Sequence, residues 1–274
     1  MEEESRPGRL SSAFFSFQGS EAETMTFNQC EFDIRCEWGE NGVASLAPIS
    51  DAIIIVDVMS FSTAVVVAAA RGASVYPYRW KDDSRIAFAG SVNAELAGPR
   101  GRTKYSLSPV SLMSIPNGAR LVLPSPNGST LSLSTGATPT FAGCLRNARA
   151  VAQAASERGT RVSIVPCGER WREDGSLRPA LEDLIGAGAI IGHLPGSLSP
   201  EAQAAVAAFR SAESDLIGTL KQCSSGKELI AMGFEDDIPL IAVVDADDCA
   251  PILENGVYIR AGQDAPADAD KTRR

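Results

Sequence analysis

The feature that most constrains the fold is an unbroken run of five apolar residues that ends at an aspartate. Residues 52–56 read Ala-Ile-Ile-Ile-Val, and Asp57 follows them. A run that is rich in β-branched residues and has no polar alternation is typical of a strand covered on both faces, as in a parallel sheet between two layers of helices. The run therefore predicts an α/β fold in which Asp57 closes a buried strand.

The same succession of an apolar run, a short polar loop and a helical stretch recurs along the chain. It predicts strands at residues 52–56, 73–77, 120–123, 138–144, 161–166 and 238–244, with a short edge strand at 257–259. It predicts helices at residues 64–71, 129–136, 148–158, 181–194 and 200–211. Strands that alternate with helices indicate βαβ units, so we expect a mostly parallel sheet with helices on both faces.

The two ends of the chain differ from its middle in composition. Residues 1–26 and 261–274 are polar and show no sustained hydrophobic period. We interpret the first as a mobile N-terminal extension and the second as a disordered tail. Between them, residues 27–260 are long enough to bury the core of one domain.

The charge and the apolar runs limit the partners. The formal net charge is −9, which repels nucleic acid and anionic lipid at long range. The longest apolar runs are too short for a membrane-spanning helix or for the core of a signal peptide. We therefore expect a cytoplasmic protein that binds neither nucleic acid nor a membrane, and we leave a homodimer open.

The metal-binding residue types are also limited. The chain has one histidine, and its six cysteines include no CxxC pair. We expect the cysteines to be reduced, buried thiols. A metal in this chain would therefore be held by oxygen ligands, as magnesium is.

Small polar side chains follow the predicted strands. Because the carboxyl ends of parallel strands meet at one edge of a sheet, we expect these residues to line the site. They are Asp57, Ser60, Ser62, Thr63, Asn127, Gly128, Ser129, Thr130, Asn147, Cys167 and Gly168. Asp57 is a candidate metal ligand, base or nucleophile, or it only caps the next helix. The amides near Ser62 and after Asn127 open predicted helices, so we expect them to hold an anion in one cavity.

Two further carboxylates, Glu182 and Asp183, open a predicted helix. Acidic residues in a first turn suit the helix dipole, which is one reading. Their neighbours Leu181, Leu184 and Ile185 are apolar, however, so at least one carboxylate faces the sheet and needs a partner such as a metal.

Five short motifs, in this order, resemble the 2-phosphosulfolactate phosphatases (ComB-like proteins). The resemblance covers about residues 28–260. The motifs stand at residues 55–63, 106–109, 125–130, 145–148, and 165–168 together with 181–183. The resemblance implies a ComB-like fold and a magnesium-dependent phosphatase that releases phosphate from 2-phospho-3-sulfolactate. It also implies that the partner of this chain is a small anionic phosphorylated substrate.

The resemblance also implies roles for the candidate residues. Asp57 and Glu182 would be catalytic, and Asp57, Glu182 and Asp183 would hold Mg²⁺. The substrate-binding residues would be Ser60, Ser62, Thr63, Ser108, Asn127, Gly128, Ser129, Asn147, Cys167 and Gly168. Cys167 is either a nucleophile or a small lining residue, and the attacking group is either water or Asp57.

The chain departs from the family pattern at two places. Ser106 and Leu107 stand where the family motif has Gly-Asn before Ser-Pro, and the second departure is at Ser60. Ser60 stands where the family motif has an arginine, and a serine cannot form a bidentate clamp on an anion. The cations that could compensate are Arg100, Arg102, Lys104, Arg146 and Arg170. The alternative to a phosphatase is a non-catalytic small-anion binding protein on the same scaffold.

Overall fold

The computed structural model describes residues 27–80, 82–263 and 265–266. The predicted extension at residues 1–26 and most of the predicted tail, residues 264 and 267–274, lie outside this part of the chain.

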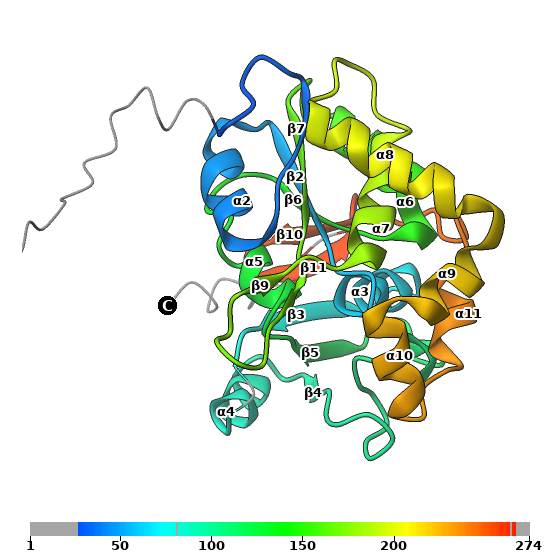
Figure 1. Cartoon of the computed structure of the whole chain (residues 1–274). Helices are drawn as coiled ribbons and strands as arrows, with labels where there is room; N and C mark the ends of the chain where they lie inside the picture. The colour runs from blue at the N-terminus through cyan, green and yellow to red at the C-terminus, as the bar shows by residue number, and fades with distance from the viewer. Residues whose placement is uncertain (1–26, 81, 264, 267–274) are drawn as a thin grey trace, which may run out of the picture.

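Within these residues, nine strands form one mixed sheet in the order β1-β7-β2-β6-β10-β11-β3-β5-β4 (Figure 1). A separate small sheet pairs β8 with β9. The strands are β1 Ile34–Cys36, β2 Ala52–Val56, β3 Ser74–Tyr78, β4 Glu95–Leu96, β5 Arg120–Pro124, β6 Thr140–Gly143, β7 Val162–Pro166, β8 Glu169–Arg170, β9 Leu177–Arg178, β10 Pro251–Glu254 and β11 Val257–Arg260.

The large sheet consists of two parallel groups joined by a hairpin. Strands β1, β7, β2 and β6 are parallel to one another, as are β3, β5 and β4. Strands β10 and β11 are antiparallel to each other and to their outer neighbours β6 and β3. The two groups therefore run in opposite senses, and the prediction of a mostly parallel α/β sheet is confirmed.

Helices pack on both faces of the sheet, as the run at β2 predicted (Figure 1). The helices are α2 Gly39–Leu46, α3 Phe61–Ala70, α4 Ser84–Ser91, α5 Gly128–Ser132, α6 Ala148–Ser156, α7 Leu181–Ile191, α8 Pro200–Ala212, α9 Leu216–Gln222, α10 Ser224–Ala231 and α11 Asp237–Ile241. Single turns of 3₁₀ helix are η1 Ala47–Ile49, η2 Pro109–Leu112, η3 Leu145–Asn147 and η4 Glu213–Asp215.

Strand β2 shows why its run of apolar residues is unbroken. Ile54 belongs to the hydrophobic cluster that includes side chains of α6, α7 and α8. Ile53 and Ile55 belong to the cluster on the other face, with side chains of α2 and α5. Because successive side chains of a strand point to opposite faces, a strand between two helical layers needs apolar residues at every position.

The predicted strand at residues 238–244 is wrong. Residues Asp237–Ile241 form helix α11, and Val243 lies exposed beyond its end. Pro239 stands in the first turn of this helix, where a missing amide hydrogen costs nothing, and Asp237 favours the helix dipole. A short apolar run alone does not separate a strand from a helix.

The strand at residues 257–259 exists, but it is not at the edge. As β11 it lies inside the sheet between β10 and β3. Its partner β10 was not predicted from the sequence. The two strands are joined by Asn255 and Gly256, whose φ angles of 50° and 79° are those of a tight two-residue hairpin turn.

In the part of the chain that the structure describes, no helix is long and apolar enough to cross a membrane. All six cysteines are free, and five of them are buried, as predicted for reduced thiols, whereas Cys30 is exposed.

Candidate functional site

Asp57 follows β2 directly and joins the starts of two helices. The amide of Phe61 donates to one carboxylate oxygen at 3.0 Å, and the amide of Gly128 donates to the other at 3.1 Å. Asp57 therefore caps α3, as one reading of the sequence expected, and also holds the start of α5. The two helix starts converge as predicted, but these two amides hold the carboxylate of Asp57 and not an external anion.

Asp183, in the first turn of α7, connects two strand-end loops. Its carboxylate accepts from the amide of Val58 at 2.7 Å and from the amide of Gly168 at 2.9 Å. Val58 follows β2, and Gly168 follows β7. Asp183 therefore fixes the loops after the neighbouring strands β2 and β7 to each other and to α7.

Glu182 is buried beside these residues and makes fewer bonds. Asp57, Glu182 and Asp183 are 7%, 2% and 3% exposed. The thiol of Cys223 lies near Glu182 and donates to the carbonyl of Leu220 at 3.0 Å. Burial, followed by the charge of Glu182, raises the pKa of this thiol to about 12. Among the described residues, no backbone amide bonds to Glu182, so its oxygens are the least committed of the three carboxylates.

Glu169, in β8, is a fourth acidic residue that the sequence interpretation missed. Its Oε2 accepts from the side-chain amide of Asn127 at 2.9 Å. Burial, followed by the charges of Asp57 and Glu182, raises its pKa to about 7. Glu169 follows Cys167 and Gly168 directly, so its position after a strand end was the signal that pointed to it.

Burial and neighbouring negative charge raise the pKa values of Asp57, Asp183 and Glu169. Burial raises the pKa of Asp57 to about 6, against the lowering by the amides of Phe61 and Gly128, and the charge of Glu182 adds to the rise. Burial and the charges of Asp57 and Glu182 raise the pKa of Asp183. Buried like charges are unfavourable unless a cation or a proton neutralises them.

The carboxylates suit an oxygen-binding cation, although they do not form a complete ligand cage. Among the described residues, no three His, Cys, Asp or Glu side chains are grouped closely enough to hold a metal by themselves. Magnesium keeps several waters and is commonly held by one or two carboxylates together with substrate phosphate oxygens. The donor set therefore fits magnesium bound by a pair of carboxylates better than a metal bound by protein ligands alone.

Cys167 lies among these acids with a buried thiol. Burial and the charges of Asp57, Asp183 and Glu169 raise its pKa well above the ordinary value of 9.0. The thiol therefore stays protonated at neutral pH, which suits a small lining residue and not a nucleophile.

Several predicted substrate-binding hydroxyls lie beneath the site and are already bonded. Ser62 Oγ donates to the Ile55 carbonyl at 2.9 Å, Thr63 Oγ1 to the Val58 carbonyl at 2.9 Å, and Ser129 Oγ to the Leu123 carbonyl at 3.1 Å. All three side chains are fully buried. These hydroxyls order the loops, and any contact with a ligand must come from other atoms.

Asn147 is likewise used within the fold. Its side-chain amide donates to the carbonyls of Ala142 and Cys249, and its carbonyl oxygen accepts from the amide of Cys144 at 2.9 Å. It caps η3 and connects the end of β6 to the segment before β10.

Gly128 is required by space and not by a left-handed turn. It is not in the positive-φ region, so the Asn-Gly pair here is not the left-handed turn that the sequence suggested. A Cβ atom at Gly128 would lie 2.2 Å from the ring of Phe61 and 2.8 Å from Asp57 Oδ2. The helix α5 that follows is also shorter than predicted and ends at Ser132.

Of the five cations that the sequence left open, Arg100 reaches Ser60. Its Nη2 donates to Ser60 Oγ at 2.8 Å, and its Nη1 pairs with Asp237 at 2.6 Å. Arg146 instead pairs with Asp247. Arg170 pairs with Glu40, Lys104 lies near Glu95, and Arg102 is exposed. Ser108 joins the Arg100 group, because its hydroxyl donates to Asp237 at 2.5 Å.

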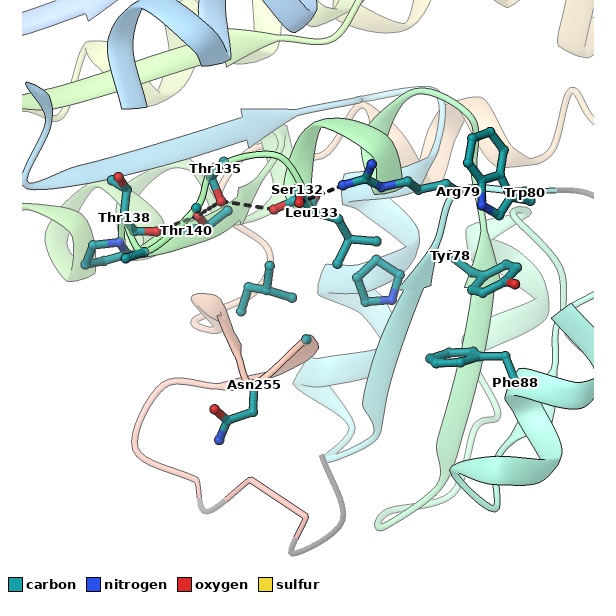
Figure 2. A pocket seen from close by; sticks show the side chains of 16 residues that line it. Tyr78, Arg79, Trp80, Phe88, Ser132, Leu133, Thr135, Thr138, Thr140 and Asn255 are labelled. Atoms are coloured by element: carbon teal, nitrogen blue, oxygen red, sulfur yellow. Dashed lines mark hydrogen bonds between the residues drawn. The ribbon is translucent and has the colours of Figure 1, made fainter. Parts of the chain in front are cut away.

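A cavity of about 700 Å³ lies elsewhere, between the end of β3 and the β10–β11 turn (Figure 2). Tyr78 stacks on Phe88 beside it, and Arg79 reaches the carbonyl of Leu133 at 2.7 Å. None of the predicted site residues lines this cavity. The acidic cluster is therefore separate from it.

Comparisons with known proteins agree with the motifs. The model of the 2-phosphosulpholactate phosphatase family matches residues 43–256. A probable 2-phosphosulfolactate phosphatase of Gloeobacter violaceus is 31% identical over 212 residues, which cover 73% of this chain and 87% of that protein. The probable enzyme of Carboxydothermus hydrogenoformans is 30% identical over 211 residues, 73% of this chain and 85% of that protein. The 2-phosphosulfolactate phosphatase of Methanothermobacter thermautotrophicus is 30% identical over 139 residues, 51% of this chain and 58% of that protein. This chain belongs to the 2-phosphosulfolactate phosphatase family.

Proposed function

We propose that this protein is a magnesium-dependent phosphatase that hydrolyses a small acidic phosphate monoester, with 2-phosphosulfolactate as the first candidate. The names of its relatives support the reaction. The observation that carries the proposal is the group of buried carboxylates around Asp57. Burial and the charges of neighbouring acids raise the pKa values of Asp57, Asp183 and Glu169, and a bound cation would neutralise this charge.

Glu182 and Asp57 are the residues that would hold the magnesium ion. Glu182 is buried and has no backbone amide on its oxygens, and Asp57 keeps a second lone pair on each oxygen. When bound, the ion would neutralise negative charge on the phosphoryl oxygens. Asp183 would not bind the ion but would position the site, because the two amide hydrogen bonds it accepts hold the loops that carry Asp57 and Gly168.

Glu169 is suited to move a proton. A group with a pKa near 7 is protonated in a useful fraction of molecules at neutral pH. Asn127 occupies Oε2, which leaves Oε1 to carry the proton to the leaving alcohol oxygen. The same carboxylate can then accept a proton from water.

Water, and not Asp57, is the nucleophile in this proposal. Both oxygens of Asp57 accept backbone hydrogen bonds that fix the carboxylate and withdraw electron density from it. An attacking carboxylate would have to weaken a bond that holds the start of α3 or of α5. The alternative of a non-catalytic anion-binding protein differs in one outcome, which is the release of phosphate.

The test is a substrate panel with purified full-length protein. Phosphate release is measured from 2-phosphosulfolactate, from related 2-phospho carboxylic acids and from 4-nitrophenyl phosphate, each with magnesium and with a chelator. The proposal expects turnover of an acidic monoester that the chelator abolishes and magnesium restores. No release from any of these substrates, with magnesium present, would contradict it.

A further inference from the structure

The guanidinium of Arg100 is fixed in place from two sides. Nη1 pairs with Asp237 at 2.6 Å, and Nη2 donates to the hydroxyl of Ser60 at 2.8 Å. The guanidinium also lies 5.6 Å from the ring centre of Phe234. A long side chain held in this way loses little further freedom when it binds a ligand.

Asp237 is the residue that positions Arg100. It is 2% exposed, and it also accepts from the hydroxyl of Ser108 at 2.5 Å. Asp237 opens α11, far along the chain from the loop that carries Arg100. A buried carboxylate with these partners aims the guanidinium and does not itself face a ligand.

Arg100 still has donors to offer. A guanidinium has five N–H groups, and within the described chain Arg100 makes two hydrogen bonds. Its side chain is 16% exposed, so the remaining donors are not sealed inside the protein. Structural arginines that are buried for stability alone commonly have their donors satisfied.

The position of Arg100 relative to the acids decides what it could bind. The charge of Arg100 lowers the pKa of Asp57. The pKa of Glu169 is instead raised by the charges of Asp57 and Glu182 and lowered by Arg178. Arg100 donates to Ser60, which is three residues after Asp57 and directly precedes α3, so the guanidinium lies near Asp57. A substrate with its phosphoryl group at the carboxylates would therefore have a fixed cation close by for a second charged group.

We propose that Arg100, held in position by Asp237 and Ser60, binds the second anionic group of the substrate, a carboxylate or sulfonate. Arg100 would so select phosphate monoesters with a second acidic group over those without one. A guanidinium matches the planar or trigonal oxygens of such groups with paired N–H donors. This inference rests on the proposed phosphatase function, and it adds the residue that discriminates between substrates.

The experiment compares kcat/KM for 2-phosphosulfolactate and for 4-nitrophenyl phosphate, which lacks the acid group. The first variant is Arg100→Lys, which keeps the charge but loses the paired N–H donors of the guanidinium. The second is Arg100→Gln/Asp237→Asn, which leaves no unpaired buried charge. Asp237→Asn tests positioning alone. Arg102→Gln, on the exposed neighbour in the same loop, is the control.

The Arg100 variants should lose about tenfold to a hundredfold in kcat/KM for 2-phosphosulfolactate, mainly through a higher KM. Their kcat/KM for 4-nitrophenyl phosphate should change by less than about threefold. Asp237→Asn should show the same selectivity at a smaller loss, and Arg102→Gln should match the wild type. An equal loss on both substrates, or no loss on either, would overturn the assignment.

A separate measurement keeps the inference distinct from the proposed reaction. If the wild type releases no phosphate from any substrate, the function fails, and binding of sulfolactate by calorimetry then tests Arg100 directly. If Arg100→Lys binds sulfolactate at least tenfold more weakly than the wild type, the anion site at Arg100 is supported. If the wild type and Arg100→Lys bind it equally, or neither binds it, the anion site is refuted.

Discussion

The amide of Gly128 donates a 3.1 Å hydrogen bond to the carboxylate of Asp57, although the two residues are 71 positions apart in the chain. The bond joins the loop after β5 to the loop after β2, that is, the two oppositely directed halves of the sheet. The candidate site is therefore built where both halves meet. Its geometry depends on how closely Gly128 approaches Asp57 and Phe61.

Replacing Gly128 by alanine tests this close approach. The added Cβ would lie 2.2 Å from the Phe61 ring, which is fully buried and cannot move aside freely. Gly128→Ala should lower the free energy of unfolding by about 1–3 kcal/mol and reduce phosphatase activity at least tenfold, as measured by urea unfolding and initial rates. The matched control is Gly90→Ala, where no atom lies within 4 Å of the new Cβ in an exposed part of α4. That variant should be neutral or up to about 1 kcal/mol more stable. Equal behaviour of the two variants would refute the packing argument.

Removing the carboxylate of Asp183 tests its structural role. Asp183→Ala leaves the buried amides of Val58 and Gly168 without their acceptor. Each unsatisfied buried amide costs about 1–3 kcal/mol, so the midpoint of urea unfolding should fall by an amount equivalent to about 2–5 kcal/mol. Asp174→Ala, at an exposed aspartate that accepts from the amide and hydroxyl of Ser176 in its own turn, should change stability by less than about 0.5 kcal/mol. A loss below about 1 kcal/mol in Asp183→Ala would show that water or another group replaces the carboxylate.

The raised pKa of Glu169 predicts how stability depends on pH. In the folded protein the pKa is about 7, against an ordinary value of 4.5, so the folded state binds the proton more tightly than the unfolded state. This contribution favours folding below about pH 4.5 and is lost as the pH rises toward 7. With a chelator present, the free energy of unfolding should therefore decline between these pH values, by up to about 3 kcal/mol from this group.

Substitution isolates the contribution of Glu169. Glu169→Gln keeps an acceptor for Asn127 and removes the titration, so it should reduce the decline. Glu173→Gln, at an exposed glutamate in the same β8–β9 loop, should leave the decline unchanged. Urea unfolding at about pH 5 and pH 7.5 measures the decline in the wild type and in the two variants. An equal decline in all three would show that Glu169 is not the group that titrates.

The parts of the fold that were predictable from sequence are those with a strong local pattern. The run at residues 52–56 predicted β2 to the residue, because burial on both faces leaves no polar position. Residues 238–244 were misread, because an apolar run of that length fits a helix as well, and Pro239 in a first turn was the signal against a strand. The turn at Asn255 and Gly256 was a further local signal for a hairpin, and it was overlooked.

The candidate site was predictable where its residues follow strands or where an acidic residue stands among apolar neighbours. Asp57, Cys167 and Gly168 were found because each follows a strand end, and Glu182 and Asp183 because they are acidic among apolar neighbours. The pairing of Arg100 with Asp237 joins residues 137 positions apart, and no local pattern encodes such a contact. The misread strand at 238–244 also hid the start of α11, where Asp237 lies.

The most direct test of the central claim is the rate of phosphate release by Glu182→Gln with 2-phosphosulfolactate and saturating magnesium. Glu182 is buried beside Asp57 but holds no backbone amide among the described residues, so the change removes a charge and leaves the loops bonded as before. We expect kcat/KM to fall at least about a hundredfold with an unchanged circular dichroism spectrum, while Glu213→Gln on the surface matches the wild type. Activity of Glu182→Gln within threefold of the wild type would contradict the account, because the buried carboxylates would then not be the catalytic centre.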